Sequence, residues 1–516
     1  MAAANVEVEV LIVGGGPVGL TARALLERWG VRVLLIEKHT ELSPFPRSRL
    51  VNVRSMEIFR QLGIAATVSE RGFAREYGRI RFRDTLCEQD FAAAAMVGID
   101  APIAESPVIG AITSQDRLEP TLIAAARTPV RFGVELVELA VDDDGVTAGL
   151  IERRAGIRTQ VRARYLLAAD GANSTVRQGL DIGTTGPGAM AELTTVVFDA
   201  DLRDCCAAHP AGLYFTAYGT VAPLYPEGGW AWFGRTPAHP LRTDWAAHVL
   251  RALGPRIDTK VEVLRVQHWV MNAFVAERFR HGRILLAGDA AHAVPVTGGM
   301  GMNAGIADVH NLCWKLAGIL RGWAGPELLE TYEPERLPVA QRTLRQAVAN
   351  ARLAFDVQDK RGEQLRSREP TPEHVELPWS ERFFAQLGLV LGVSYRSAAV
   401  LGVTGAAPDP GTDYLPTAGP GDRLPHRWLG PGRSTLDTLG EWFTLLAPEP
   451  ARWTQTAGAP WPLHVETLPG AHAISYELEP EEALLVRPDG HIAARLRNRG
   501  PHEITAALAA VTRSAP

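Results

Sequence analysis

The stretch VEVEVLIVGGGPVGLTARALLERWGVRVLLIE, residues 6–37, predicts the fold of the first part of the chain. Val6–Val13 shows alternation and then the unbroken apolar run of a buried strand. Three glycines end this strand, Pro17 opens a helix, and a second apolar run ends at Glu37. Strand, glycine turn, helix and strand in this order form the opening unit of a doubly wound parallel sheet, so the predicted class is α/β.

The glycine motif Gly14-Gly15-Gly16-Pro17-Val18-Gly19 is suited to binding a dinucleotide. Gly14 permits a tight turn, Gly16 lets backbone N–H groups approach a pyrophosphate, and Gly19 lets the helix pack closely on the sheet. The helix N-terminus adds partial positive charge. Glu37, which precedes Lys38, lies 18 residues past Gly19, where a carboxylate accepts hydrogen bonds from a ribose. The motif alone does not separate FAD from NAD.

The choice between FAD and NAD depends on the residues at the ends of two later strands. The apolar strand before Asp170-Gly171 is the first, and the strand before Gly288-Asp289 is the second. Pro295, a Gly-Gly pair and the run Gly301-Met302-Asn303 follow the second one.

With these three motifs in this order, the chain resembles the class A flavoprotein monooxygenases, which include para-hydroxybenzoate hydroxylase and the aromatic polyketide hydroxylases. The resemblance covers residues 6–400. The segment after Val400 resembles the thioredoxin-like C-terminal domain of the phenol hydroxylase and polyketide hydroxylase branch. The fold expected is therefore a Rossmann-like FAD domain with an inserted, mostly antiparallel substrate sheet and a thioredoxin-like domain.

The resemblance implies non-covalent FAD, NAD(P)H and O₂ as reactants, and an aromatic substrate, with the polycyclic polyketide or antibiotic type favoured. A flavin C4a-hydroperoxide would hydroxylate this substrate. Three alternatives stay open: a Baeyer–Villiger monooxygenase, an FAD-dependent dehydrogenase or reductase without oxygen transfer, and a flavin-binding assembly or sensor module. The sequence identifies no catalytic acid or base.

The resemblance also implies roles for individual residues. Asp289 would bind the flavin ribityl chain, and Asp170 would serve FAD and the passage of NAD(P)H. Arg47, favoured over Arg49, would pair with the pyrophosphate, and Gln115 would touch the flavin. The remaining expected contacts are Pro295 near the flavin C4a and the backbone of Gly299, Gly301, Met302 and Asn303 at its pyrimidine edge. Val296 stands where the family commonly has a second proline.

Four segments follow from these motifs. They are an FAD domain at 1–179, a substrate-binding β domain at 180–275, the resumed FAD domain with helices at 276–400, and the C-terminal domain at 401–516, entered through a Pro/Gly-rich linker at 405–432. Helices are expected at about 118–126, 303–320 and 332–353. Tyr214, Tyr218, Trp230 and Trp232 are candidates for lining a planar-substrate pocket, although each is more readily a core residue.

Composition excludes several other classes. A net charge of −5 gives no indication of a nucleic-acid partner, and no apolar run could cross a membrane. The N-terminus lacks the features of a signal peptide. Four cysteines without a CxxC pair predict neither a disulfide framework nor a metal site, and adjacent Cys205 and Cys206 are expected to be unrelated thiols. We expect a cytoplasmic monomer or homodimer.

Overall fold

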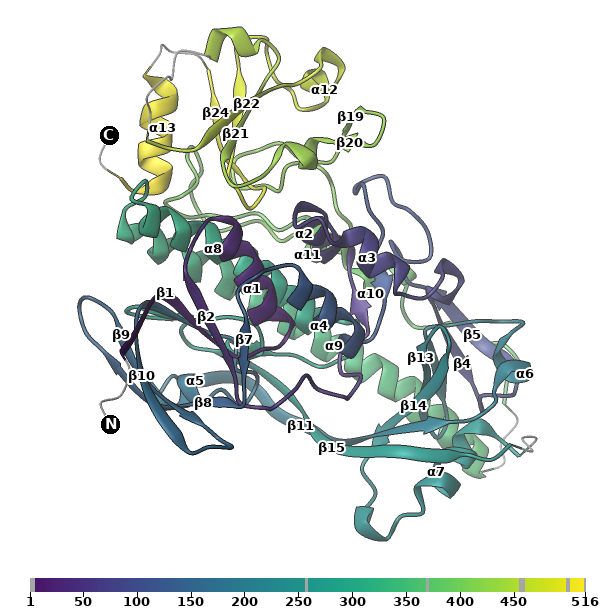
Figure 1. The fold of residues 1–516 in the computed structure, drawn as a ribbon. Helices are drawn as coiled ribbons and strands as arrows, with labels where there is room; N and C mark the ends of the chain where they lie inside the picture. The colour runs from purple at the N-terminus through teal and green to yellow at the C-terminus, as the bar shows by residue number, and fades with distance from the viewer. Residues whose placement is uncertain (1–4, 256–258, 368–370, 454–459, 498–501, 515–516) are drawn as a thin grey trace.

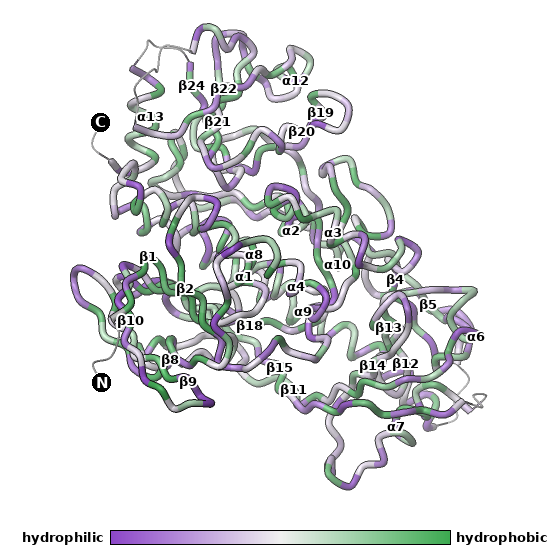
Figure 2. The backbone as a smooth tube through the Cα atoms, in the orientation of Figure 1, coloured by the Kyte–Doolittle hydropathy of each residue, from purple (hydrophilic) through white to green (hydrophobic). Residues whose placement is uncertain are grey.

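The protein is described by a computed structural model that covers residues 5–255, 259–367, 371–453, 460–497 and 502–514 (Figure 1). The ends of the predicted first and last domains, residues 1–4 and 515–516, lie outside these ranges. Figure 2 shows hydrophobic segments running through the middle of the molecule and hydrophilic loops at its rim.

The first sheet is the predicted dinucleotide-type sheet. Val10 pairs in parallel with Tyr165 on one side and with Val33 on the other, so the carboxyl ends of the central strands meet at one edge. Its strands, in spatial order, are β16 (Arg280–His281), β17 (Ile284–Leu286), β10 (Ile157–Ala168), β1 (Asn5–Val13), β2 (Val33–Glu37) and β7 (Val130–Phe132), and an antiparallel extension from β10 adds β9 (Val146–Glu152) and β8 (Val134–Val141).

Three helices pack together at this sheet: α1 (Pro17–Arg28), α4 (Gln115–Ala124) and α8 (Met300–Arg321). Two of them begin earlier than the sequence predicted. Gly299 adopts a left-handed conformation, φ 62°, and starts α8 three residues before Asn303. α4 starts at Gln115 instead of Leu118 and tolerates Pro120 inside it, so Gln115 lies in the first turn. The next helix, α9 (Tyr332–Ser367), runs well past the predicted end at 353 and packs on strand β15 (Glu262–Ala276) of the second sheet (Figure 1).

The second sheet is larger than the segment 180–275. Its strands, in spatial order, are β18 (His292–Ala293), β15 (Glu262–Ala276), β11 (Thr184–Asp199), β14 (Gly228–Arg235), β13 (Gly219–Tyr225), β12 (Leu213–Thr216), β4 (Arg79–Arg83) and β5 (Asp90–Ala95). β4 and β5 come from the segment assigned to the FAD domain, and β4 pairs with β12 in parallel. The sheet is otherwise antiparallel, as expected. A short strand pattern does not identify its pairing partner, so the sequence could not show that these two strands join the second sheet.

The C-terminal domain is built on a sheet in the order β22 (Leu463–Thr467), β21 (Phe443–Ala447), β23 (Ala483–Val486) and β24 (Ile492–Leu496), with α12 (Gly470–Ser475) and the closing helix α13 (Glu503–Thr512). β21 and β22 are parallel, whereas β23 and β24 are antiparallel to their neighbours. The predicted linker packs against this domain, because Leu424 is fully buried in its core and Arg423 bridges His491.

The remaining elements are short. They are β3 (Leu50–Val51), which pairs with β6 (Ala111–Ile112), the pair β19 (Trp428–Gly430) and β20 (Arg433–Ser434), and the helices α2 (Val53–Gln61), α3 (Ala65–Glu70), α5 (Thr175–Gly179), α6 (Arg203–Cys206), α7 (Trp245–Leu253), α10 (Glu381–Ala385) and α11 (Leu387–Leu391). No helix within the described ranges is long and apolar enough to cross a membrane.

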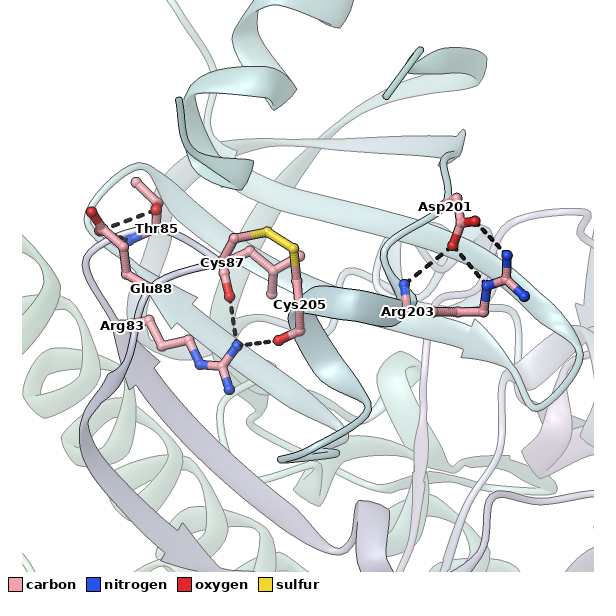
Figure 3. The surroundings of a disulfide bond; sticks show 8 residues. Arg83, Thr85, Cys87, Glu88, Asp201, Arg203 and Cys205 are labelled. Atoms are coloured by element: carbon pink, nitrogen blue, oxygen red, sulfur yellow. Dashed lines mark hydrogen bonds and ion pairs between the residues drawn. A yellow bond between two sulfur atoms is a disulfide. The ribbon is translucent and has the colours of Figure 1, made fainter. Parts of the chain in front are cut away.

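The expectation for the cysteines was wrong in one respect. Cys205 forms a disulfide with Cys87, which joins α6 to the loop that follows β4 (Figure 3). The Arg83 guanidinium donates to the Cys205 carbonyl at 2.9 Å and so supports the same junction. Cys206 and Cys313 are buried free thiols. The two bonded cysteines are 118 residues apart, so no local spacing could reveal the pair.

Candidate active site

The glycine loop after β1 has a distinct steric requirement at each position. Gly14 has φ 110°, and a methyl group there would overlap the carbonyl oxygen of Ala169. A methyl group at Gly19 would overlap the carbonyl of Gly14. At Gly16, by contrast, a methyl group would meet no protein atom within 4 Å. The loop therefore presents open space at Gly16, directly before the Pro17 end of α1, where an anionic group can lie.

Glu37, at the end of β2, is held against this loop. Its Oε2 accepts a hydrogen bond from the Gly15 N–H at 2.8 Å, and its Oε1 accepts one from the His39 N–H at 2.9 Å. Oε1 also contacts His39 Nδ1 at 2.5 Å, so Oε2 is the oxygen with a further lone pair for a ribose hydroxyl. Lys38 is half-buried, and its charge acts on Glu135 of β8.

The first turn of α4 brings polar atoms to the same sheet edge. Gln115 Nε2 donates to Glu119 Oε1 at 2.7 Å, and burial raises the pKa of Glu119 to about 7. The side-chain oxygens Ser114 Oγ, Asp116 Oδ1 and Glu119 Oε2 are buried without a hydrogen-bond partner among the described residues. Of these residues, the sequence motifs predicted a flavin contact only for Gln115.

Asp170 follows β10 beside the glycine loop, because a methyl group at Gly14 would approach its Cα to 3.0 Å. Its Oδ2 accepts from the Val176 N–H and from Thr175 Oγ1, each at 3.2 Å, whereas its Oδ1 is buried without a partner in the part of the chain described. Buried oxygens of this kind are normally satisfied by protein, water or ligand.

Asp289 and the start of α8 lie together after β17. A methyl group at Gly301 would lie 3.8 Å from Asp289 Oδ1 and 3.4 Å from Val294. The Asp289 side chain is exposed to solvent, yet the protein around it is dense enough to raise its pKa by desolvation. Met302 is half-buried and packs on the main core. Pro295 is buried, and Val296 is 58% exposed, so the departure from the family pattern falls on the surface of this loop.

Asn303 fixes the first turn of α8. Its Oδ1 accepts from the Asn52 N–H at 3.0 Å, and its Nδ2 donates to Leu50 O at 2.9 Å and to Gly299 O at 2.6 Å. The side chain therefore ties α8 to β3, and its role is to hold the helix start in place.

The two arginines after β2 differ in what they contact. Arg49 donates to the carbonyls of Gly212 and Pro223 in the second sheet. Arg47 is exposed, and its guanidinium has no hydrogen-bond or ion-pair partner among the described residues. Its positive charge acts on both Glu119 and Asp289, where it opposes the rise in pKa caused by burial. Arg47 is therefore the arginine left available for a phosphate.

The four candidate substrate aromatics do not share one environment. Tyr214 and Trp232 are fully buried in the core between the second sheet and α7, and half-buried Trp230 packs on the same core. Tyr218 is 43% exposed. Because Tyr214 and Trp232 are fully buried in this core, the prediction that they line a substrate pocket is wrong. The opposite face of the sheet carries Leu224, Tyr225, Ala231 and Phe233.

The site as a whole fits an FAD molecule. Open space at a glycine loop, a free arginine, unpartnered buried oxygens and a strand-end aspartate surround one edge of a parallel sheet, which is where such sheets bind nucleotides. Gln115, Asp170 and the segment from Asp289 to the first turn of α8 come from three regions far apart in sequence. The fold and the site define a flavoprotein of the dinucleotide-binding class.

Comparison with known families agrees with this geometry. The family described as FAD binding domain matches residues 7–347, and the one described as aromatic-ring hydroxylase, C-terminal, matches residues 417–515. The chain therefore belongs to the FAD-dependent aromatic-ring hydroxylases, which are flavin monooxygenases, and FAD is its cofactor.

Individual relatives are similar over nearly the whole chain. Identity is 34% over 544 residues with the tetracenomycin A2 monooxygenase-dioxygenase of Streptomyces glaucescens, covering 95% of this chain and 93% of the relative. Identity is 35% over 491 residues with an aklavinone 12-hydroxylase of Streptomyces peucetius, covering 89% of this chain and 95% of the relative. A solved structure of the monooxygenase PieE with FAD and substrate is 32% identical, with a TM-score of 0.88 and coverage of 99% and 100%. One of aklavinone-11 hydroxylase with FAD and aklavinone is also 32% identical, with a TM-score of 0.82 and the same coverage.

Proposed function

We propose that the protein uses NAD(P)H and O₂ to place one oxygen atom on a polycyclic aromatic substrate of the polyketide type. The observation that carries this proposal is the near full-length similarity to enzymes named for tetracenomycin and aklavinone. The exposed Arg47, the open glycine loop and the second sheet beside them supply a cofactor site next to a surface that could receive a large planar ring.

We assign the cofactor as follows. The pyrophosphate lies at Gly14 and Gly16, on the N-terminus of α1, with Arg47 as its cation and Glu37 on the ribose. Asp289 accepts hydrogen bonds from the ribityl chain. Asp170, Gln115, Pro295 and the helix start at Gly299–Asn303 complete the contacts. Bound FAD supplies the oxygen and electron chemistry, as cofactors of this kind do.

The protein's own contribution is placement and electrostatics. The N-terminus of α8, held by Asn303, offers partial positive charge to an anionic ring edge. Half-buried Tyr225 and Phe233 lie on the face of the second sheet opposite the α7 core, and we propose that the substrate ring packs there. A requirement for NAD(P)H supports a cytoplasmic location, whereas the Cys87–Cys205 disulfide is the feature that argues against it.

The experiment is to follow NADPH and NADH oxidation by the FAD-loaded protein with a panel of polycyclic phenols and quinones, with H₂O₂ measured in parallel. The proposal expects one class of polycyclic compound to accelerate oxidation severalfold while H₂O₂ stays low. A ring-hydroxylated product supports hydroxylation, and a lactone would identify the Baeyer–Villiger alternative. Oxidation that no aromatic compound accelerates would overturn the proposal.

A further inference from the structure

A small, partly open cavity lies where α8, α9 and α11 meet the C-terminal domain, and it reaches the start of α8 at Met300 and Asn303. Its volume is about 60 Å³, which is room for a few water molecules or for a monatomic anion. The polar side chains that line it include Arg54, Arg336, Arg423, His310, Asp489 and His491. Asp489 and His491 belong to the C-terminal domain, so the cavity is at the junction of two domains.

The cavity lies within a buried charge network that has more cations than carboxylates. Arg54 and Arg423 share Glu57, Arg487 joins Asp489 to Glu335, Lys315 also pairs with Glu335, and Arg336 pairs with Asp308. Each of these side chains is at most 11% exposed. Among the residues that the structure describes, five cations therefore face four carboxylates in this network. An uncompensated charge in a desolvated site is costly, so this excess calls for an anion.

His491 is the second independent observation. It is 4% exposed, and neither ring nitrogen has a hydrogen-bond partner among the described residues. Its Nδ1 lies 3.6 Å from Asp489 Oδ1, beyond hydrogen-bond distance, and its ring lies against Tyr395 at a centroid distance of 4.0 Å and an interplanar angle of 30°. Burial lowers the pKa of His491 and, to about 3, that of His310, so both rings are neutral. A neutral His491 offers one N–H donor to the cavity.

The surrounding guanidinium groups also have donors to spare. Arg54 donates to Glu57 at 3.0 Å and to the Asp489 carbonyl at 2.8 Å, and Arg336 donates to Asp308, Tyr395 and the Ala304 carbonyl. A guanidinium group carries five N–H donors, so unused N–H groups remain on both arginines.

We propose that this cavity binds one small monovalent anion with the size and charge of chloride, which accepts hydrogen bonds from His491 and the neighbouring guanidinium groups. The anion neutralises the cation excess and joins the C-terminal domain to α8 and α9. Burial, with a smaller contribution from the Arg487 charge, lowers the pKa of Lys315 to about 8 against the opposing effect of Glu335. In the competing arrangement the cavity holds only water, and Lys315 loses its proton, so that four cations face four carboxylates.

Bromide is the direct probe for the site. Crystals of the full-length, FAD-loaded protein grown without halide and soaked in bromide should show an anomalous peak within contact distance of His491. The thermal midpoint should also rise by about 3 °C when chloride, at roughly a hundredfold above its dissociation constant, replaces gluconate at equal ionic strength.

Two variants test the two features separately. His491→Phe keeps an aromatic ring against Tyr395 and removes the donor, whereas Lys315→Met removes the cation excess without changing the cavity lining. Each should abolish the chloride-dependent shift. His464→Phe, the same substitution at a half-exposed position of the same domain, should retain it. A wild-type cavity with no bromide peak, or equal midpoints in chloride and gluconate, would overturn the proposal even if a variant failed to fold.

Discussion

Asp308 and His292 are joined by a hydrogen bond of 2.6 Å between Oδ2 and Nε2, and both side chains are completely buried. The same carboxylate accepts from the Gly288 N–H at 3.1 Å and from Arg336 Nε at 2.7 Å. Asp308 thus connects α8 to the loop that presents Asp289 and to α9. Burial alone would raise its pKa, but His292 and Arg336 outweigh burial and lower it to about 2.

Asp308→Asn should destabilise the protein by about 3–5 kcal/mol, because it leaves the Arg336 guanidinium buried without its carboxylate. Retention of FAD should fall as well, since the Asp289 loop loses its anchor. Urea unfolding and FAD titration measure both effects. Asp359→Asn is the control: its ion pair with Arg235 is exposed at 3.3 Å, and its loss should change stability by less than about 1 kcal/mol. Equal unfolding midpoints for the two variants would contradict this role for Asp308.

Gly16→Ala separates folding from cofactor binding. The added methyl group meets no protein atom within 4 Å, so the stability of the FAD-free protein should stay unchanged. The group does occupy the space assigned to the pyrophosphate, and FAD affinity should fall at least about tenfold, or 1.4 kcal/mol. Gly430→Ala, which also meets nothing within 4 Å and lies in β19, should leave FAD affinity intact. Unchanged FAD affinity in Gly16→Ala would place the pyrophosphate elsewhere.

Glu119 predicts a pH dependence. Burial raises its pKa from 4.5 to about 7, so the folded protein binds the proton more tightly than the unfolded chain. Glu119 therefore causes no loss of stability below pH 4.5, and destabilises the fold increasingly as pH rises to about 7. Above that range the penalty is about 3 kcal/mol, which Glu119→Gln should remove. Urea unfolding of the FAD-free proteins at about pH 5 and about pH 8 tests this. A stability difference that does not change with pH would show that Glu119 titrates normally.

Trp232→Phe should affect stability and leave catalysis unchanged. The indole is 1% exposed and its Nε1 donates to the Tyr218 carbonyl at 2.9 Å, so the smaller ring leaves a void and an unpaired carbonyl. We expect a loss of about 1–3 kcal/mol in the free energy of unfolding, with an unaltered KM for the aromatic substrate. A severalfold rise in KM at unchanged stability would restore Trp232 to the substrate pocket.

The sequence was most informative where one local motif has one physical solution. Gly14, Gly16 and Gly19 each serve a separate steric need, and the strand ends before Asp170 and Asp289 follow unbroken apolar runs. These features predicted the parallel sheet, the class of cofactor and the edge at which the site forms.

The sequence was least informative about contacts between residues or strands that lie far apart in the chain. Cys87 and Cys205 meet through the fold of the second sheet, and β4 joins that sheet from a distant segment. Alternation along β14 puts Trp230 and Trp232 on one face but does not say which face is buried under α7. Asp308 and Glu119 went unnoticed, although Glu119 is one helical turn from Gln115, a spacing that could have identified it.

The most direct test of the central claim is to supply ¹⁸O₂ and NAD(P)H to the FAD-loaded protein with the polycyclic phenol that best accelerates turnover, and to analyse the product by mass spectrometry. We predict a product that carries a single oxygen-18 atom, with one NAD(P)H consumed for each product molecule. A product without the label, or complete recovery of the substrate while all the oxygen appears as H₂O₂, would contradict oxygen transfer by this enzyme.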